Sequence, residues 1–302
     1  MEKIRNTFAN LLFKLGKKDK KIIVIVGDIS HGIFKNFRES FKDRYFNIGI
    51  CEPSMVNISA GLSKLKLIPV VHTIAPFLIE RSYEQIKLDF GYQKLGINLV
   101  SVGGSFDYSK LGCSHHSYSD VSLISHIKNS NIVIPASPLE FQILFKKIYK
   151  KNMINYFRLP DNNHGIKIEK RKIIFGKSVK IRSGNKLTIC VTGPYLKNVL
   201  EAEEKLNLKG KIDILYFHTI KPFDSKSVLK SVKKTKKLIT IEDLSAQGGI
   251  YNLCVNSCHE VNNIITKQIA IKDFIHSYGS FDDLKKKAGL DTQSIMNIIN
   301  NL

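Results

Sequence analysis

The chain has 302 residues, of which 43% are hydrophobic, and it carries a formal net charge of +21. This length is sufficient for two domains with separate hydrophobic cores, and the composition is typical of a globular protein. No run of eighteen apolar residues occurs, so we expect neither a membrane span nor a membrane partner. The five cysteines are scattered and odd in number. This favours a reducing compartment, and we expect a cytoplasmic location.

The positive charge raises the question of a nucleic-acid partner. The lysines occur in short runs spread along the chain, such as KKDKK and KKTKK, and they are not interleaved with aromatic residues. None of these runs lies in a recognisable nucleic-acid-binding motif. We therefore expect no specific nucleic acid, and a lysine-rich surface is the plainer interpretation of the charge.

Residues 1–20 are predicted to form an N-terminal helix. The helical apolar pattern extends from Ile4 to Leu15 and ends at Gly16, before a lysine-rich stretch. Because the apolar run is short and no small-residue cleavage site follows it, we interpret this segment as a helix and not as a signal peptide.

Residues 21–159 alternate strand-like and helix-like segments. The first strand, KIIVIVGD, is a continuous apolar run, as expected for a parallel strand that is buried on both faces. Further strands are expected at 45–50, 67–72, 97–102, 131–136 and 153–159, with helices at 34–41, from 53, 79–92, 120–127 and 138–149. This order predicts an α/β domain with a doubly wound, mostly parallel sheet.

A second α/β domain is predicted after a linker. Residues 160–186 are polar and rich in lysine and glycine, and the alternating runs KIIFG and VKIRSG predict a hairpin within this linker. Residues 187–302 then resume the alternation of strands and helices in a smaller α/β domain, which ends in a helix from Asp291.

One carboxylate stands out in the stretch FNIGICEPSMVNISAGLSKL. Glu52 follows an apolar strand and precedes a helix of mostly small and apolar residues, so burial is expected on both sides. Pro53 fits the first turn of that helix, which places Glu52 at a helix start on the carboxyl edge of the sheet. A buried unpaired carboxylate costs several kcal/mol. Either a ligand or a simple charge at the positive end of the helix dipole would account for it.

The surrounding residues resemble a known family. The segment from Phe46 to Ile86 is similar to the pyrimidine-binding domain of transketolases, with a Gly-Ile-x-Glu-x-x-Met helix, a Pro-Val strand, Thr, Phe and an Arg…Gln-Ile helix. GCSHHSYSDVSLI is similar to that family's Gly-x-Thr/Ser-His…Asp segment. HTIKPFD, TIEDLSAQGGI and GLDTQSI resemble the transketolase C-terminal domain. These motifs keep the family's order over residues 21–302.

The resemblance implies a thiamine diphosphate cofactor. In this family the glutamate that matches Glu52 hydrogen-bonds N1′ of the aminopyrimidine ring, and its proton promotes the imino tautomer that deprotonates thiazolium C2. Phe77 matches the aromatic residue on which the pyrimidine ring stacks, and an apolar platform suits a flat heteroaromatic ring. Arg81, one turn further along, is expected to support the same pocket, although a role at a subunit interface is also open.

The resemblance also implies substrate-binding residues. His115 matches a catalytic position in the substrate channel, where an imidazole donates to a sugar oxygen or relays a proton. Arg158 matches the arginine that holds a substrate phosphate, and His31 is assigned to the same substrate side. Three positions depart from the family pattern, since Leu111 replaces an aspartate, Gly32 a serine and Gly103 a histidine. These changes speak against assuming the usual pentose phosphates.

The diphosphate-binding half of such an enzyme is not evident in this sequence. The family holds Mg²⁺ and the phosphates with a Gly-Asp-Gly…Asn run, and Gly27-Asp28 is followed here by Ile29. No metal ligands are therefore predicted on this chain. A separate N-terminal, diphosphate-binding transketolase subunit is predicted as the partner, in a heterotetramer with two copies of each subunit around a homodimer core.

We predict a two-carbon ketol transferase acting on sugar phosphates or on a nucleotide-linked sugar. Three alternatives stay open at this point. They are the β subunit of a 2-oxoacid dehydrogenase, a non-catalytic assembly subunit, and a basic RNA-binding protein whose binding would depend on salt.

Overall fold

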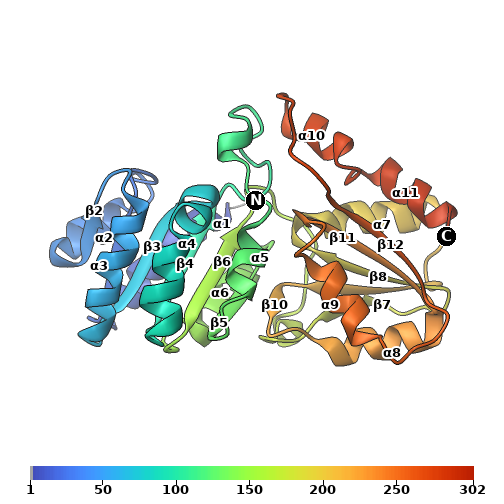
Figure 1. Cartoon of the computed structure of the whole chain (residues 1–302), viewed down its shortest axis with the longest axis horizontal. Helices are drawn as coiled ribbons and strands as arrows, with labels where there is room; N and C mark the ends of the chain where they lie inside the picture. The colour runs from blue at the N-terminus through green and yellow to red at the C-terminus, as the bar shows by residue number, and fades with distance from the viewer. Residues whose placement is uncertain (1–2) are drawn as a thin grey trace. The chain divides into compact units, whose positions relative to one another are not determined.

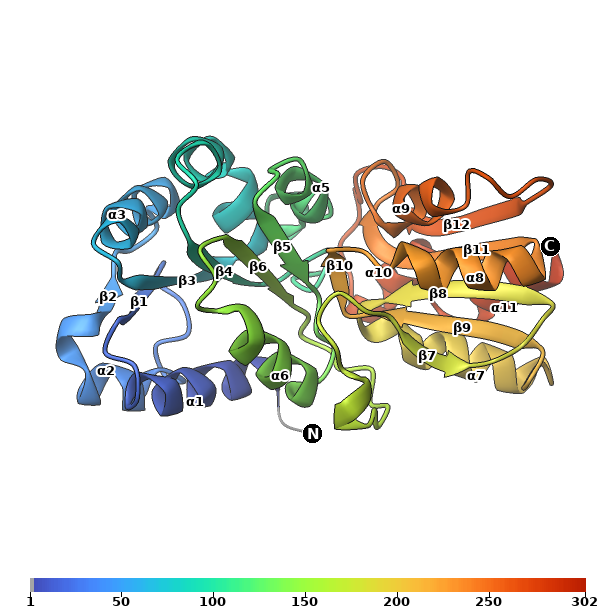
Figure 2. The ribbon, with the colours of Figure 1, turned by 90° about the horizontal axis from the view of Figure 1, so that it is seen from below.

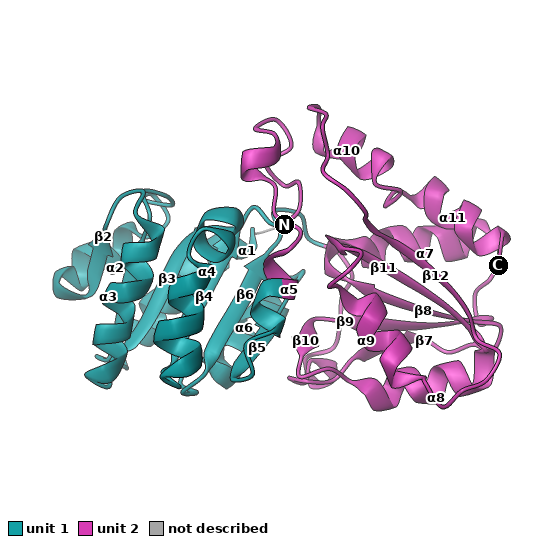
Figure 3. Cartoon of the chain, viewed as in Figure 1, with its two compact units in different colours: residues 1–104, 123–163 teal, residues 105–122, 164–302 magenta. Residues whose placement is uncertain are grey.

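The computed structural model describes residues 3–302, and these form two compact units (Figure 3). Unit 1 holds the residues up to Gly104 together with Leu123–Asn163, and unit 2 holds Ser105–Ser122 together with His164–Leu302. Both units are α/β, as the sequence predicts. The segment 105–122 belongs to unit 2, whereas the sequence placed it within the first domain. No helix within residues 3–302 is both long and apolar enough to cross a membrane.

Unit 1 is built on a parallel sheet (Figure 1). Its strands are arranged in the order β5-β6-β4-β3-β1-β2, and every neighbouring pair runs parallel. The strands are β1 (Ile22–Val26), β2 (Tyr45–Asn47), β3 (Ile68–Ile74), β4 (Ile97–Val102), β5 (Ser130–Val133) and β6 (Ile154–Leu159). Because all of them run the same way, their carboxyl ends lie along one edge of the sheet, where open α/β sheets bind ligands.

Helices cover both faces of this sheet (Figure 2). Helices α1, α2 and α6 lie on one face, and α3 lies on the other together with the helical turns of residues 76–92, which pack on it. The helical elements of this part of the chain are α1 (Ile4–Gly16), α2 (Lys35–Ser40), η1 (Lys42–Arg44), α3 (Glu52–Lys64), η2 (Pro76–Glu80), α4 (Tyr83–Gln85), η3 (Ile86–Tyr92), α5 (Asp120–Ser125) and α6 (Pro138–Ile148). The rings of Phe8 and Phe141 meet edge to face at 5.6 Å, so the buried faces of α1 and α6 share one core.

The helix predicted at 79–92 is not a regular α-helix. The chain forms a π-helical turn, η2, then the short α4, then a second π-helical turn, η3. Pro76 lies in the first of these turns, and π-turns of this kind are frequent at functional sites. Phe77 and Arg81 lie in and directly after η2.

Unit 2 contains a five-stranded sheet in the order β12-β11-β8-β9-β7. Helices α7 and α11 lie on one face of it, and α8 and α9 lie on the other (Figure 1). The remaining elements are η4 (Cys113–His115), η5 (Lys170–Lys172), β7 (Val179–Arg182), β8 (Leu187–Thr192), η6 (Gly193–Tyr195), α7 (Leu196–Lys205), β9 (Ile212–Phe217), β10 (Thr219–Lys221), α8 (Ser225–Thr235), β11 (Lys237–Ser245), α9 (Ile250–Ser257), β12 (Ile265–Ile271), α10 (Phe281–Lys287) and α11 (Thr292–Asn300).

The prediction of a hairpin within the linker is wrong. The first of its two runs, residues 172–176, continues from the end of the single turn η5 as a loop, and the second contains β7. β7 pairs antiparallel with β9 at the edge of the second sheet, with Val179 opposite Tyr216. An isolated two-stranded hairpin is only marginally stable, whereas the exposed edge of β9 offers a partner that is already part of a larger sheet.

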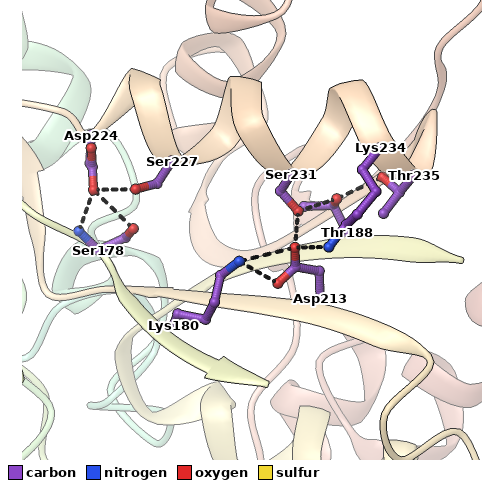
Figure 4. Close-up of polar contacts among 9 residues, drawn as sticks. All are labelled: Ser178, Lys180, Thr188, Asp213, Asp224, Ser227, Ser231, Lys234 and Thr235. Atoms are coloured by element: carbon purple, nitrogen blue, oxygen red, sulfur yellow. Dashed lines mark hydrogen bonds and ion pairs between the residues drawn. The ribbon is translucent and has the colours of Figure 1, made fainter. Parts of the chain in front are cut away.

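A buried carboxylate ties β7 to the centre of unit 2 (Figure 4). Asp213 on β9 accepts hydrogen bonds from Ser231 at 2.8 Å and from Lys234 at 3.0 Å, and Lys180 of β7 lies 3.1 Å from its second oxygen. These donors hold the pKa of Asp213 below its usual value although burial acts to raise it. The network joins β7, β9 and α8.

Candidate active site

Glu52 occupies the position that the sequence predicts. It is the first residue of α3 and is followed by Pro53, and its side chain is only 1% exposed. Met55 continues the turn by donating its backbone N–H to the Cys51 carbonyl oxygen. The short β2 ends at Asn47, so the four residues 48–51 carry the chain from the sheet edge into the helix.

The Glu52 carboxylate has a cationic partner. Nη1 of Arg81 donates a hydrogen bond to Oε2 of Glu52 at 2.7 Å, and the arginine side chain is 43% exposed. The same guanidinium lies over the ring of Phe77, with its Cζ 4.2 Å from the ring centroid. The structure therefore brings together three residues that were predicted from the sequence. The Arg81 guanidinium contacts both the Glu52 carboxylate and the Phe77 ring.

A second polar cluster lies at the same edge of the sheet. The backbone N–H of Asp28 donates to Oδ1 of Asn47 at 2.9 Å, and the Asn47 amide donates to Oδ1 of Asp28 at 3.2 Å. His31 lies 2.9 Å from the same carboxylate oxygen, and its hydrogen bond is the main cause that lowers the pKa of Asp28. The cluster is exposed, so His31 can contact a ligand.

A buried histidine supports this edge from within the sheet. Nδ1 of His72 lies 2.7 Å from the carbonyl oxygen of Val100, and Nε2 lies 2.9 Å from Oγ of Ser30. Arg5 donates to the same hydroxyl at 2.9 Å. Burial lowers the pKa of His72 to about 3. The imidazole is therefore neutral. It donates a hydrogen bond through Nδ1–H to the Val100 carbonyl oxygen and accepts one from the Ser30 hydroxyl at Nε2.

Two further predicted residues belong to other elements. Arg158 lies on β6 and is buried, and a Cβ added to Gly104 would fall 2.5 Å from its Nε. His115 belongs to unit 2, where it ends η4 and its Nδ1 lies 3.0 Å from Oγ of Ser114. The assignments of Arg158, His115 and His31 to substrate stay predictions.

Two family models match consecutive parts of the chain. The model of the transketolase pyrimidine-binding domain matches residues 2–166, and the model of the transketolase C-terminal domain matches residues 176–295. The first match alone covers more than half of the chain. The chain belongs to the transketolase family. The sequence resemblance is thereby confirmed, and members of this family use thiamine diphosphate.

Several relatives match nearly the whole chain. A 6-deoxy-6-sulfo-D-fructose transketolase subunit of Clostridium sp. (strain MSTE9) is 28% identical over 97% of this chain and 92% of its own. One of the apulose-4-phosphate transketolase subunits of Phocaeicola vulgatus is 28% identical over 96% of this chain and 94% of its own. The 1-deoxy-D-xylulose-5-phosphate synthase of Clostridium perfringens is 32% identical, and this chain spans 48% of its length.

Solved structures confirm the fold. A split-gene transketolase, described as an inactive β4 tetramer, matches 99% of this chain with a TM-score of 0.88 at 24% identity. The transketolase of Campylobacter jejuni subsp. jejuni NCTC 11168 matches 99% of this chain with a TM-score of 0.80, and this chain covers 46% of that protein.

The sequence did not predict all of this site. It selected Arg81 as a supporting residue but did not predict its ion pair with Glu52, because the two are 29 positions apart. It also missed the bond between Asp28 and Asn47 and the buried His72. A histidine inside the apolar run of β3 was the available signal, since a polar residue buried in a central strand requires partners.

Proposed function

We propose that this chain is one subunit of a two-subunit, thiamine diphosphate-dependent transketolase. Together with a separate diphosphate-binding subunit, it would transfer a two-carbon ketol unit between sugar or sugar phosphate substrates. The observation that carries the proposal is the buried carboxylate of Glu52 at the start of α3, beside the Phe77 ring.

The residues present fit the pyrimidine half of the cofactor. Glu52 offers a carboxyl group in a water-poor position, where a hydrogen bond to a ring nitrogen is strong. Phe77 offers a ring face, which Arg81 covers at 4.2 Å in this structure. A flat heteroaromatic ring takes the same kind of position over an aromatic face as a guanidinium does. We infer that Arg81 moves from Phe77 when that ring binds.

Each side chain then has a defined task. Thiamine diphosphate, when bound, supplies a carbon nucleophile and an electron sink for cleaving and forming the bond next to a carbonyl. Glu52 holds and shares a proton with the ring nitrogen, and Phe77 orients the ring. His31, held by Asp28, and His115 would donate hydrogen bonds to substrate oxygens, and Arg158 would bind a substrate phosphate.

A partner subunit is part of the proposal for two reasons. Two relatives that match this chain over more than nine tenths of their own length are described as transketolase subunits. Among residues 3–302, no group of three or more His, Cys, Asp or Glu side chains could hold a metal ion. We therefore assign Mg²⁺ and the diphosphate to the partner, in an assembly of two copies of each chain.

The substrate is expected to differ from an ordinary pentose phosphate. Leu111 cannot accept a hydrogen bond from a substrate hydroxyl, and Gly32 offers none to a phosphate. The subunits that resemble this chain include one for a sulfonated deoxysugar and one for apulose 4-phosphate. A screen should therefore include modified ketoses, among them nucleotide-linked ones.

The test is Glu52→Gln in the complex of both subunits. The amide keeps the size of the side chain but cannot give up a proton, so we expect thiamine-dependent ketol transfer to fall by roughly 10²- to 10⁴-fold. Assembly, measured by mass in solution, should not change.

Glu84→Gln is the matched control because Glu84 is an exposed carboxylate on α4. It should leave turnover unchanged. Wild-type turnover in the Glu52→Gln complex would contradict the assignment of Glu52, and thiamine-independent turnover in the wild type would contradict the proposed function.

A further inference from the structure

The loop that carries His115 is attached to the C-terminal unit. Residues 105–122 follow β4 in the sequence and lead into α5, yet they belong to unit 2 (Figure 3). The loop closes on itself, because Ser105 and Ser117 exchange both of their backbone hydrogen bonds. Its far end is fixed to β11, since the backbone N–H of Ser245 donates to the Tyr118 carbonyl oxygen at 2.8 Å.

Aromatic side chains from residues 272–281 hold this loop. We call that segment the aromatic strap. The rings of Phe106 and Phe281 lie 5.2 Å apart, and the rings of Tyr118 and Phe274 lie 6.3 Å apart in an edge arrangement. Contacts of this geometry stabilise beyond the apolar area that they bury. The strap therefore grips the loop at both of its ends.

Tyr278 holds the loop at its tip, next to His115. A Cβ added to Gly112 would lie 2.5 Å from Cε1 and 2.9 Å from Oη of Tyr278, so the ring lies directly against the glycine. Gly112 has a φ of +75°, in the region that favours glycine. His115 follows after one turn, and its backbone N–H donates to the Gly112 carbonyl oxygen at 3.0 Å. A shift of Gly112 is therefore passed to His115.

The strap itself is only partly supported. Residues 272–280 form no helix or strand. A cavity of about 610 Å³ is lined by Ala270–Ser277 and by Lys287–Gly289, so one side of the strap is not packed. Phe274 and Tyr278 are 59% and 71% exposed. Exposed aromatic rings on a segment with little support of its own are ordered mainly by their contacts with the loop.

We propose that the aromatic strap positions the His115 loop and that Tyr278 is its positioning residue. The C-terminal unit thereby fixes the position of His115 and, through it, the affinity of the enzyme for its substrate. The role of His115 in this inference rests on the proposed function. The packing of the strap on the loop is independent of that function.

The test uses Tyr278→Ala and Tyr278→Phe in the complex of both subunits. Kinetics are measured with the donor and acceptor sugars that give the highest turnover of the wild-type complex in the screen of modified ketoses described above. We expect Tyr278→Ala to raise KM by roughly tenfold with a smaller change in kcat, and Tyr278→Phe to stay near the wild type because it keeps the ring. Ile265→Ala, which removes exposed apolar surface from β12 of the same unit, should have no effect.

Two readouts separate positioning from a general loss of structure. In a His115→Ala background, Tyr278→Ala should have no further effect on KM, because it acts through His115. Amide hydrogen exchange in residues 105–122 should become faster in Tyr278→Ala and not in Tyr278→Phe.

The possible failures are distinct. An unchanged KM together with unchanged exchange in Tyr278→Ala would overturn the inference, as would additive effects of Tyr278→Ala and His115→Ala. An absence of thiamine-dependent turnover in the wild-type complex would overturn the proposed function. In that case, unchanged amide hydrogen exchange in residues 105–122 of Tyr278→Ala would still overturn the proposal that the strap positions the loop. Faster exchange in these residues would support it.

Discussion

At the scale of single residues, the ion pair of Glu52 and Arg81 has unequal partners. The carboxylate is buried, at 1% exposure, while the guanidinium is 43% exposed. Removing a partner from a buried charge is costly because the remaining charge stays out of water. The exposed arginine can be solvated when Glu52 is neutralised, whereas the buried glutamate gains little from water when Arg81 is lost. Arg81 thus makes the buried carboxylate tolerable while no ligand is present.

This asymmetry predicts the stability of the single variants. Arg81→Ala should lower the free energy of unfolding by about 2 kcal/mol, and Glu52→Gln by less than about 1 kcal/mol. In the Glu52→Gln background, Arg81→Ala should cost little. Urea titration of the isolated chain measures all three. Arg38→Ala, at an exposed arginine on α2, is the control, and an equal cost for Arg38→Ala and Arg81→Ala would contradict the pairing.

At the scale of elements, His72 connects four segments of unit 1. The hydrogen bonds run from Arg5 on α1 to Ser30 after β1, to His72 on β3, and to Val100 on β4. Ser30 has a φ of 65°, in the left-handed region, so its hydroxyl bonds help to hold an unfavourable backbone conformation next to His31. The neutral imidazole fits this series of hydrogen bonds because it donates a hydrogen bond at one nitrogen and accepts one at the other.

Protonation of His72 would end that arrangement, which gives a pH prediction. Burial lowers the pKa of His72 to about 3 in the folded state, from 6.5 in its absence. Between these values the unfolded state binds more protons than the folded state, so stability falls as the pH drops below about 6.5. We expect His72 to contribute a loss of about 1.4 kcal/mol for each pH unit in this window.

The measurement is urea unfolding between pH 6.5 and 4.5 for the wild type and for His72→Gln. The variant should start less stable, and its stability should fall less steeply with acid. His259→Gln, at a histidine whose side chain is 74% exposed, should keep the slope of the wild type. Parallel slopes for the wild type and His72→Gln would contradict the role of the buried imidazole.

At the scale of the whole molecule, the proposed function requires a cofactor site that two subunits share. Under that proposal, Glu52, Phe77 and Arg81 hold the pyrimidine end of the cofactor, and a separate subunit holds its diphosphate and metal ion. In that proposal, neither subunit holds the whole cofactor by itself.

We therefore expect isolated chain to bind thiamine diphosphate weakly. Calorimetric titration with Mg²⁺ present should show affinity on the order of 100-fold higher, about 2.7 kcal/mol, for the mixture with its partner subunit. Chelation of Mg²⁺ should remove most of that gain. Equal affinity for the isolated chain and the mixture would contradict the division of the cofactor site.

Local patterns in the sequence were sufficient to predict Glu52 and the parallel sheets. Glu52 lies between a strand and a helix that starts with proline, so a few neighbouring residues determine its place at the sheet edge. The buried runs of β1, β4 and β6 likewise predict parallel strands by themselves. Family motifs then supplied the chemistry, since a fold does not determine function.

Tertiary structure decided the contacts between distant segments. The pairing of Arg81 with Glu52 depends on where the π-helical turn η2 directs a side chain, and the pairing of β7 depends on the edge of the sheet at β9. The packing of the His115 loop on a strap more than 150 positions later depends on aromatic rings that meet only in the folded chain. Local propensity and burial are encoded within short windows, whereas such contacts are selected by the free energy of the whole chain.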